Sequence, residues 1–297
     1  MSDKHHFLPP ETLDAISNIE VVARYLAEGS SMGMHRSLYK GFSSEFAEYR
    51  KYCPGDSVKY LDWFAYAKTD RYYVKQFEDE TNMNSYVVLD ISNSMAMPGT
   101  KRHKFNYACY MAAAFIYLMQ RQRDAVGLFI FNDIIRGYYP PRNSRQHMLD
   151  LLSVLENLSP GGRTDAAKCF HGIADQIKRR SIVVIFSDFF DLDSEFLKSL
   201  EHFRYKKAEV ILFQVLDETE LQLPYKGLVE FEDMETGEVV EFESEFSRET
   251  YMREFNGYVQ RLKASCEKMN IMFETISTSS PFERSLLAYF TKREELF

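Results

Sequence analysis

From Ser85 onwards, two kinds of hydrophobic pattern alternate along the chain, and their alternation predicts the fold. Short apolar runs rich in β-branched residues are followed by longer stretches in which apolar residues recur every three or four positions. The first pattern is typical of buried strands and the second of amphipathic helices. The expected strands are 86–89, 126–131, 134–139, 182–186, 210–216 and 271–276, and the expected helices are 105–119, 146–158, 165–179, 194–203, 250–269 and 283–292.

Several of the expected strands are apolar on both faces, which indicates a parallel sheet that helices cover on both sides. We therefore predict an α/β fold with a doubly wound, mostly parallel sheet of about five parallel strands and one antiparallel edge strand. Residues 81–297 should form this α/β domain. Residues 1–80 should form a separate N-terminal segment that begins with a helix near 11–28, where apolar residues again recur at helical spacing.

Residues 218–245 interrupt the alternation and predict a β-hairpin insertion, because two alternating runs flank the turn-like sequence Met-Glu-Thr-Gly-Glu at 234–238. Residues 228–245 carry eight acidic side chains and no Lys or Arg, whereas residues 36–75 carry a net charge of 8 − 5 = +3. We expect the N-terminal segment and the hairpin to form one small β-rich appendage, in which residues 71–78 pair with a hairpin strand.

Composition narrows the classes of function. Thirty-six basic and 44 acidic residues give a net charge of −8, which disfavours binding to nucleic acid or to anionic membranes. No apolar run approaches the roughly 18 residues of a membrane span, and the first residues are too polar for a secretory signal. The four cysteines lie far apart without metal-binding spacing, as is typical of reduced thiols, so we expect a cytoplasmic protein.

Oxygen-bearing side chains stand at the ends of two apolar strands and before one helix. Ligands of open α/β sheets bind at such strand ends. Carboxylate and hydroxyl oxygens suit Mg²⁺ or another hard divalent ion such as Mn²⁺, although an Asp or Ser in this position can also be a simple helix cap. The predicted metal donors are Asp90, Ser92, Ser94, Thr164 and Asp188, with Ser187 and Asp165 in a supporting position.

Two patterns carry a resemblance to known families. The Asp90-x-Ser92-x-Ser94 loop, with the later Thr164 and the strand-end Asp188, resembles the metal-ion-dependent adhesion site of von Willebrand factor type A domains. The upstream motifs resemble the signature of the domain-of-unknown-function family 58, von Willebrand A-like proteins that are often encoded beside MoxR-type AAA+ ATPases. These motifs are GFSSEF at 41–46, YRKYCPGD at 49–56, DW at 62–63, TDR at 69–71 and EDETN at 78–82.

The resemblance spans roughly residues 13–287 and implies a metal-dependent protein-binding module. In such sites serine and threonine hydroxyls, with water-bridged aspartates, hold Mg²⁺ or Mn²⁺, and an open coordination position accepts a carboxylate from a partner. The partner that the resemblance implies is a MoxR-type ATPase, its client protein, or both. The chain departs from the adhesion-receptor pattern in one place, because Phe189 follows Asp188 where those receptors have glycine.

Other functions are compatible with parts of the sequence. An aspartate after the first strand also suits a Mg²⁺-dependent phosphoryl hydrolase on an α/β fold, but hydrolases of the haloacid-dehalogenase type have a second Asp where this chain has Ser92. No nucleophile paired with a base is recognisable, so we expect that the protein is not an enzyme. A structural protein whose site binds no metal is a third interpretation.

Two apolar residues are candidates for contact with a partner. Trp63, the only tryptophan, suits a partner-binding anchor, but packing of the N-terminal segment onto the sheet explains it more simply. Met95 adjoins the predicted metal loop and suits either partner contact or the filling of a gap in the core.

Overall fold

The computed structural model describes residues 45–51, 63, 66, 71–78, 83–97, 103–190 and 194–282 of the chain. These residues belong to two compact units, one within residues 34–82 and the other from Met83 onwards. The helices predicted at 11–28 and 283–292 lie outside the described residues.

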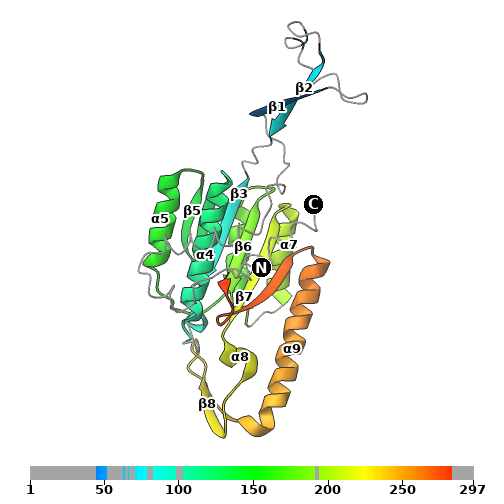
Figure 1. The fold of residues 1–297 in the computed structure, drawn as a ribbon. Coiled ribbons are helices and arrows are strands. Elements are labelled where there is room, and N and C mark those ends of the chain that lie inside the picture. The colour runs from blue at the N-terminus through cyan, green and yellow to red at the C-terminus, as the bar shows by residue number, and fades with distance from the viewer. Residues whose placement is uncertain are drawn as a thin grey trace, which may run out of the picture. The chain divides into compact units, whose positions relative to one another are not determined.

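A six-stranded sheet forms the centre of the larger unit (Figure 1). Its spatial order is β10-β7-β6-β3-β4-β5, in which β4 and β5 pair antiparallel and the other four pairs are parallel. This confirms the predicted sheet of five parallel strands with one antiparallel edge. The strands are β3 (Asn84–Asp90), β4 (Ala125–Phe131), β5 (Ile135–Arg142), β6 (Ile182–Ser187), β7 (Glu209–Leu216) and β10 (Met272–Ser277).

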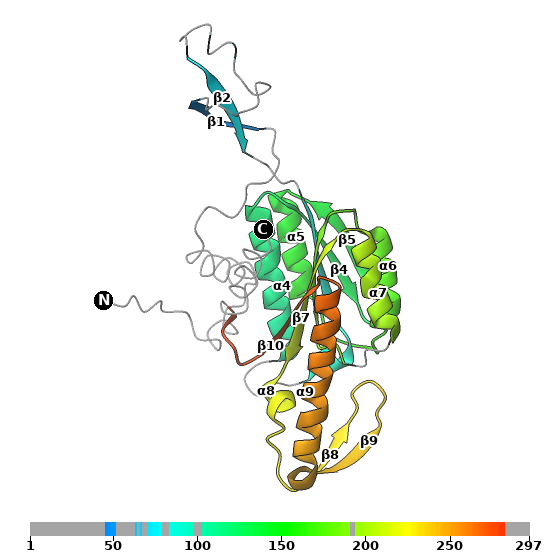
Figure 2. The same cartoon turned by 90° about the vertical axis from the view of Figure 1, so that its right-hand side faces the viewer.

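Helices cover both faces of the sheet, with α4 and α5 on one face and α6 and α7 on the other (Figure 2). No helix in the described ranges combines the length and the apolar character that a bilayer crossing requires. The helices are α4 (Lys104–Arg121), α5 (Arg145–Glu156), α6 (Ala166–Gln176), α7 (Ser194–Tyr205), α8 (Glu218–Gln222) and α9 (Ser244–Lys268), together with the 3₁₀ helix η2 (Asn93–Ala96).

The continuous apolar runs of the strands are explained by burial on both faces. On one face, Phe115 of α4 packs against the rings of Phe186 and Phe213, with centroid distances of 5.9 and 5.6 Å. On the other face, alternate strand residues such as Val88 join a buried cluster with Phe170 of α6 and side chains of α7 and α9. A sheet packed on both sides is rigid, and it fixes the positions at which its strands end.

The register of β3 and β6 brings two of the predicted polar segments to one level. These neighbouring parallel strands place Leu89 opposite Phe186. Asp90 and Ser187, which follow these two residues, therefore leave the sheet side by side at its carboxyl end. This is the position at which open α/β sheets bind their ligands.

Two antiparallel strand pairs lie outside the central sheet. In the unit within residues 34–82, β1 (Glu45–Lys51) pairs with β2 (Tyr73–Glu78). The predicted hairpin is formed by β8 (Leu228–Glu232) and β9 (Val239–Glu243), which pair with each other. The expected pairing of residues 71–78 with a hairpin strand is therefore wrong. Local pairing closes a shorter loop, and attraction between exposed charges, worth about 0–1 kcal/mol per pair, does not outweigh it.

Candidate metal site

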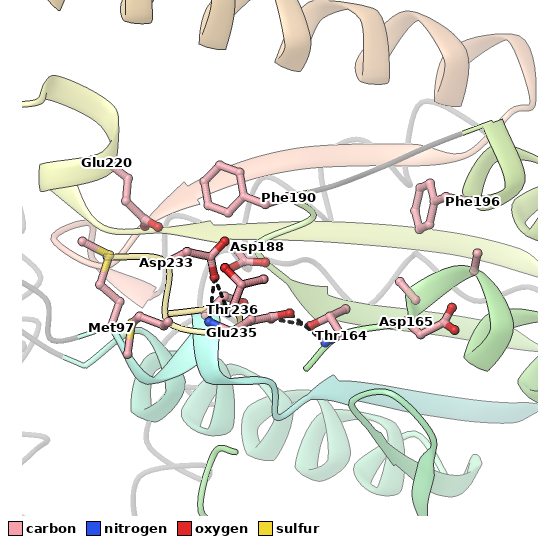
Figure 3. Close-up of a pocket in the computed structure, with 14 residues that line it drawn as sticks. Met97, Thr164, Asp165, Asp188, Phe190, Phe196, Glu220, Asp233, Glu235 and Thr236 are labelled. Carbon is pink, nitrogen blue, oxygen red and sulfur yellow. Dashed lines mark hydrogen bonds between the residues drawn. The ribbon is translucent and has the colours of Figure 1, made fainter. Parts of the chain in front are cut away.

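Three of the five predicted metal donors line one cavity of about 530 Å³. Ser94 belongs to η2, which follows β3. Thr164 comes from the segment before α6 and Asp188 from the loop after β6, and Figure 3 shows both on the cavity wall. The other two predicted donors, Asp90 and Ser92, are completely buried. The five residues thus divide into a cavity wall and a buried layer.

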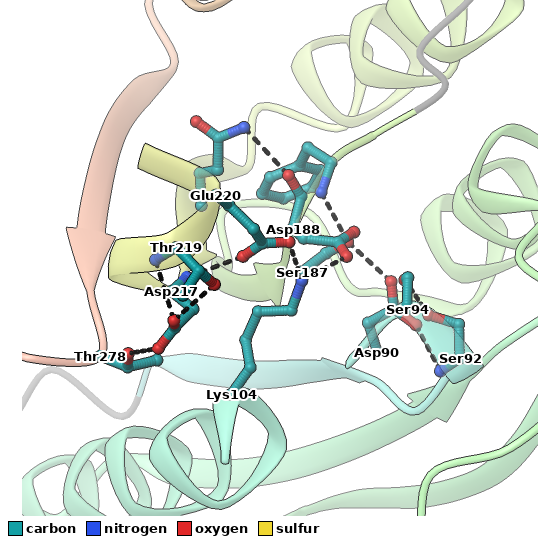
Figure 4. A network of polar contacts seen from close by, with 12 residues as sticks. Asp90, Ser92, Ser94, Lys104, Ser187, Asp188, Asp217, Thr219, Glu220 and Thr278 are labelled. Atoms are coloured by element: carbon teal, nitrogen blue, oxygen red, sulfur yellow. Dashed lines mark hydrogen bonds and ion pairs between the residues drawn. The ribbon is translucent and has the colours of Figure 1, made fainter. Parts of the chain in front are cut away.

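Asp90 is held from two sides at the end of β3. Its Oδ1 accepts a hydrogen bond of 2.8 Å from the backbone N–H of Ser92, and its Oδ2 accepts one of 2.6 Å from the Ser187 hydroxyl. The Ser92 hydroxyl lies 3.0 Å from that of Ser94, which reaches the cavity. A chain of polar groups therefore connects Ser187 and the buried carboxyl to the cavity wall (Figure 4).

Backbone contacts hold the segment before α6 against the loop after β3. The N–H of Asn93 donates to the carbonyl of Gly162 at 2.8 Å, and the N–H of Gly161 donates to the carbonyl of Ile91 at 2.6 Å. Gly162 has a φ of +86°, and a Cβ there would come within 2.7 Å of the Asn132 side-chain nitrogen. The glycine permits the close approach that carries the following residues to the cavity.

Asp188 is bound to a buried lysine that sequence analysis missed. Lys104, the first residue of α4, is fully buried, and its Nζ lies 2.9 Å from Oδ2 of Asp188 and 2.8 Å from Oε1 of Glu220 (Figure 4). Burial alone would lower the pKa of Lys104, but the two carboxylates raise it above its ordinary value. Lys104 is therefore a permanent cation that fixes the orientation of Asp188.

The contacts of Glu220 extend this network to the edge of the sheet. Glu220 completes a capping box at the start of α8, because its Oε2 accepts from the backbone N–H of Asp217 at 2.7 Å. Asp217 in turn accepts a hydrogen bond of 2.6 Å from the hydroxyl of Thr278, which follows β10. The lysine thus links the cavity to α8 and, through Asp217, to the segment after β10.

The charge of these buried groups suits a divalent cation. Burial and the nearby carboxylate of Asp188 raise the pKa of Asp90 to about 7. When Asp90, Asp188, Glu220 and Lys104 are all ionised, their formal charges sum to −3 + 1 = −2. Within the described ranges, no three His, Cys, Asp or Glu side chains gather into a metal-binding cluster. The hydroxyl groups of Ser94 and Thr164 on the cavity wall are further oxygen donors, and carboxylate and hydroxyl oxygens are ligands that suit Mg²⁺ or Mn²⁺.

Another carboxylate reaches the cavity from the β8–β9 hairpin. Glu235, at the hairpin tip, accepts hydrogen bonds of 2.9 Å from both the N–H and the hydroxyl of Thr164. Thr164 is thus bound to a carboxylate that comes from 71 residues further along the chain.

The comparisons with known proteins identify the family of this chain. The model of the family described as "Protein of unknown function DUF58" matches residues 48–264. The chain belongs to the DUF58 family. The uncharacterized proteins Mb1516 of Mycobacterium bovis and Rv1480 of Mycobacterium tuberculosis are each 30% identical to it over 236 residues, which is 78% of this chain and 74% of theirs.

Two solved structures resemble this DUF58 protein at low sequence identity. One is the conserved hypothetical protein BatB from Bacteroides thetaiotaomicron, at 12% identity, and the other is an aerotolerance-related membrane protein from Bacteroides fragilis, at 15% identity. In both comparisons the alignment covers 72% of this chain and 99% of the other, with a TM-score of 0.48.

In the loop after β6 of this DUF58 protein, a phenylalanine adopts a backbone conformation that usually requires glycine. Phe189 has a φ of +50°, in the left-handed region that favours glycine. Its N–H donates to the Ser187 hydroxyl at 3.1 Å, and its carbonyl accepts a hydrogen bond from the Tyr258 hydroxyl. The ring is buried against Phe196, with a centroid distance of 5.9 Å. Core packing of the ring offsets the backbone strain, so the departure from the adhesion-receptor pattern leaves Asp188 at the cavity.

Two substitutions at Phe189 should separate packing from strain. We expect Phe189→Ala to lower the free energy of unfolding by about 3–5 kcal/mol, because the buried ring is lost. Phe189→Gly should cost about 1 kcal/mol less than Phe189→Ala, because glycine relieves the positive φ. Urea denaturation of both variants measures the difference. A Gly variant less stable than the Ala variant would show that the backbone at this position is not strained.

The remaining predicted residues have different surroundings. Asp165 caps α6, because its side chain accepts from the N–H of Lys168 at 3.1 Å, and it also lines the cavity. Met95 is completely buried in η2, so a role in partner contact, which requires exposure, is not compatible with its position. Trp63 is 61% exposed and contacts Tyr66 edge-on, with a ring-centroid distance of 6.4 Å.

Sequence analysis missed two residues of the site for different reasons. A lysine in the first turn of a helix opposes the helix dipole, so Lys104 was a detectable anomaly that called for an acidic partner. Glu235 had no such signal, because it is one of eight acidic residues between 228 and 245, and nothing in the sequence distinguishes it from a solvated neighbour.

Proposed function

We propose that this DUF58 protein is a metal-ion-dependent protein-binding module that captures a carboxylate of a protein partner. Mg²⁺ or Mn²⁺ would be held mainly by the hydroxyls of Ser92, Ser94 and Thr164, with the carboxylates of Asp90 and Asp188 acting through bound water. The observation that carries the proposal is the pair of buried aspartates at the ends of neighbouring strands, next to a cavity with hydroxyl groups on its wall.

Neutral hydroxyl donors explain why such a site would bind an anion. A bound divalent ion would supply a centre of positive charge that attracts an anionic oxygen from outside, and the Glu or Asp side chain of a partner is a suitable donor. The chain itself orients the carboxyls around this position. Ser187 holds Asp90, and Lys104 holds Asp188.

The surroundings of Asp90 favour binding over catalysis. A nucleophilic aspartate has to reach its substrate, whereas Asp90 has no exposed surface. Both of its oxygens already accept hydrogen bonds, from Ser92 and Ser187. We therefore propose that the protein is not a hydrolase. Incubation with a generic phosphate ester and Mg²⁺ should give no turnover above that of the Asp90→Asn variant.

The partner that we propose is a MoxR-type AAA+ ATPase or its client, with the present chain as an adaptor or chaperone-like component in the cytoplasm. The support is the resemblance of the motifs between residues 41 and 82 to the family signature, together with the DUF58 match, which begins at residue 48 and includes most of these motifs. The net charge of −8 agrees with a protein partner rather than nucleic acid.

A pull-down from the native host tests this function. The wild-type chain should retain the ATPase or its client in Mg²⁺ and lose it in EDTA, and Asp90→Ala should lose it in both. Equal recovery under all conditions, with the variant still folded by circular dichroism, would show that the site does not mediate binding.

Single hydroxyl deletions should weaken partner capture without unfolding the domain. We expect Ser92→Ala or Thr164→Ala to reduce recovery in Mg²⁺ by about tenfold, the loss that corresponds to roughly 1.4 kcal/mol of binding free energy. Ser85→Ala is the matched control, because the Ser85 hydroxyl is buried in β3 without a hydrogen-bond partner. Full recovery with all three variants would remove the hydroxyls from the proposed donor set.

A further inference from the structure

The tip of the β8–β9 hairpin forms part of the wall of the metal-site cavity. Asp233, Met234, Glu235 and Thr236 line the same cavity as Thr164 and two other proposed metal donors (Figure 3). An insertion distant in sequence therefore lies at the position from which a partner would have to approach.

The carboxylate of Glu235 makes a two-point contact with Thr164. Its Oε2 accepts from the backbone N–H and its Oε1 accepts from the side-chain hydroxyl, both at 2.9 Å. Hydrogen bonds to an ionised carboxylate are stronger than those between neutral groups. One of the proposed metal donors thus already binds the kind of group that the partner is proposed to supply.

The backbone of the tip is bound as well as its side chain. The side-chain N–H of Asn93 donates to the carbonyl of Met234 at 3.0 Å, and Nε of Arg163 donates to the carbonyl of Glu235 at 3.3 Å. Asn93 and Arg163 belong to two of the three segments that carry the proposed donors, the one after β3 and the one before α6. These loops therefore bind a carboxylate together with the two carbonyl groups beside it.

The tip is held in a turn of its own. Oδ1 of Asp233 accepts from the N–H groups of Glu235 and Thr236 at 2.7 and 2.9 Å, and these bonds lower the pKa of Asp233. Gly237 supplies the positive φ, +73°, that closes the turn. In contrast, Leu228, Val239 and Val240 on the strands are 58–68% exposed. The anchored part of the hairpin is thus its acidic turn.

We propose that the hairpin tip occupies the partner's position, as an internal mimic of an acidic turn in the partner protein. On this view, which rests on the proposed function, the partner presents a glutamate on a turn. Its carboxylate replaces that of Glu235 at Thr164, and its carbonyls replace those bound by Asn93 and Arg163. The tethered tip competes at a high effective concentration, so only a partner that displaces it can bind.

The competition can be measured with a peptide that copies the tip. The probe is the acetylated and amidated pentapeptide Asp-Met-Glu-Thr-Gly, the sequence of residues 233–237, and its control has Gln in place of Glu. The full-length chain is compared with Glu235→Gln and with the matched variant Glu241→Gln, an exposed residue of β9 away from the tip. Binding is followed in Mg²⁺ and in EDTA by the NMR shift of the Thr164 amide.

We expect the peptide to bind Glu235→Gln at least about tenfold more tightly than the wild type or Glu241→Gln in Mg²⁺, because a short tether supplies roughly millimolar competitor. The Gln peptide should bind all three proteins weakly. If the acidic peptide binds the three proteins with equal affinity while Mg²⁺ still stabilises them against heat, this inference is overturned and the proposed function is not. Equal binding of the two peptides has the same consequence.

Failure of the proposed function has a different signature. If Mg²⁺ stabilises none of the three proteins, the metal-dependent function is wrong. Tighter binding of the acidic peptide to Glu235→Gln in EDTA would then still support the tip as the occupant of an acidic-turn site. Equal affinity in EDTA would overturn both.

Discussion

Replacing Lys104 by methionine should lower the free energy of unfolding by about 3–5 kcal/mol, the usual cost of breaking a buried ion pair from one side. The lysine ammonium is fully buried and binds the carboxylates of Asp188 and Glu220 at 2.9 and 2.8 Å. Methionine fills a similar volume but leaves two buried carboxylates without their cation. Urea denaturation of the metal-free protein measures the loss.

Two further variants separate the buried network from a general effect of charge. Adding Glu220→Gln to Lys104→Met should recover part of the stability, because one of the unpaired carboxylates is removed. Lys198→Met is the surface control, since this lysine is 62% exposed in its ion pair with Glu195 and should contribute only about 0–1 kcal/mol. If Lys104→Met costs no more than Lys198→Met, the network is not what holds Asp188 in place.

Mg²⁺ should raise the melting temperature of the wild type, and Asp90→Asn should abolish the effect. At 100 times its dissociation constant, a ligand that binds only the folded state adds about 2.7 kcal/mol of stability. For a unit of this size such a gain corresponds to roughly 5–10 °C. Differential scanning fluorimetry with and without Mg²⁺ measures the shift. Asp150→Asn, at an exposed position of α5, is the control that should keep it.

Without metal, in EDTA, Asp90→Asn should not lower the stability of the protein. Burial and the neighbouring Asp188 raise the pKa of Asp90 to about 7, so the ionised carboxyl destabilises the metal-free fold at neutral pH and above. Asp90→Asn removes this charge and should be at least as stable as the wild type in EDTA. A variant that is much less stable in EDTA would assign Asp90 a structural role instead.

The central sheet could be predicted from the sequence because its signal is local and repeated. Runs such as Ile182–Phe186 are apolar at every position, and only burial on both faces explains this pattern. The edge strand β5 was also expected, but it is not continuously apolar, and in the structure its residues alternate between half-buried and exposed. The pairing of the smaller strands was not predictable, because complementary net charge says little about which strands exchange hydrogen bonds.

The candidate site likewise contains residues that local sequence patterns predict and residues that they do not. Asp90 ends β3, Ser92 and Ser94 come shortly after it, and Asp188 follows β6, so the fold itself brings these residues to one end of the sheet. The prediction of Thr164 required the additional expectation that its loop lies against the residues after β3 and β6. Lys104 and Glu235 depend on contacts across 84 and 71 residues, whose partners no local pattern specifies.

Anomalous diffraction can show both whether the protein binds a metal ion and where the ion lies. Crystals of the full chain grown with saturating Mn²⁺ would be measured on both sides of the manganese absorption edge. We expect one anomalous peak at the cavity wall that carries Ser94, Thr164 and Asp188, and no peak there in crystals of Asp90→Asn. Ordered wild-type crystals with no peak at this wall, or with an equal peak in the variant, would contradict the metal-dependent account of this protein.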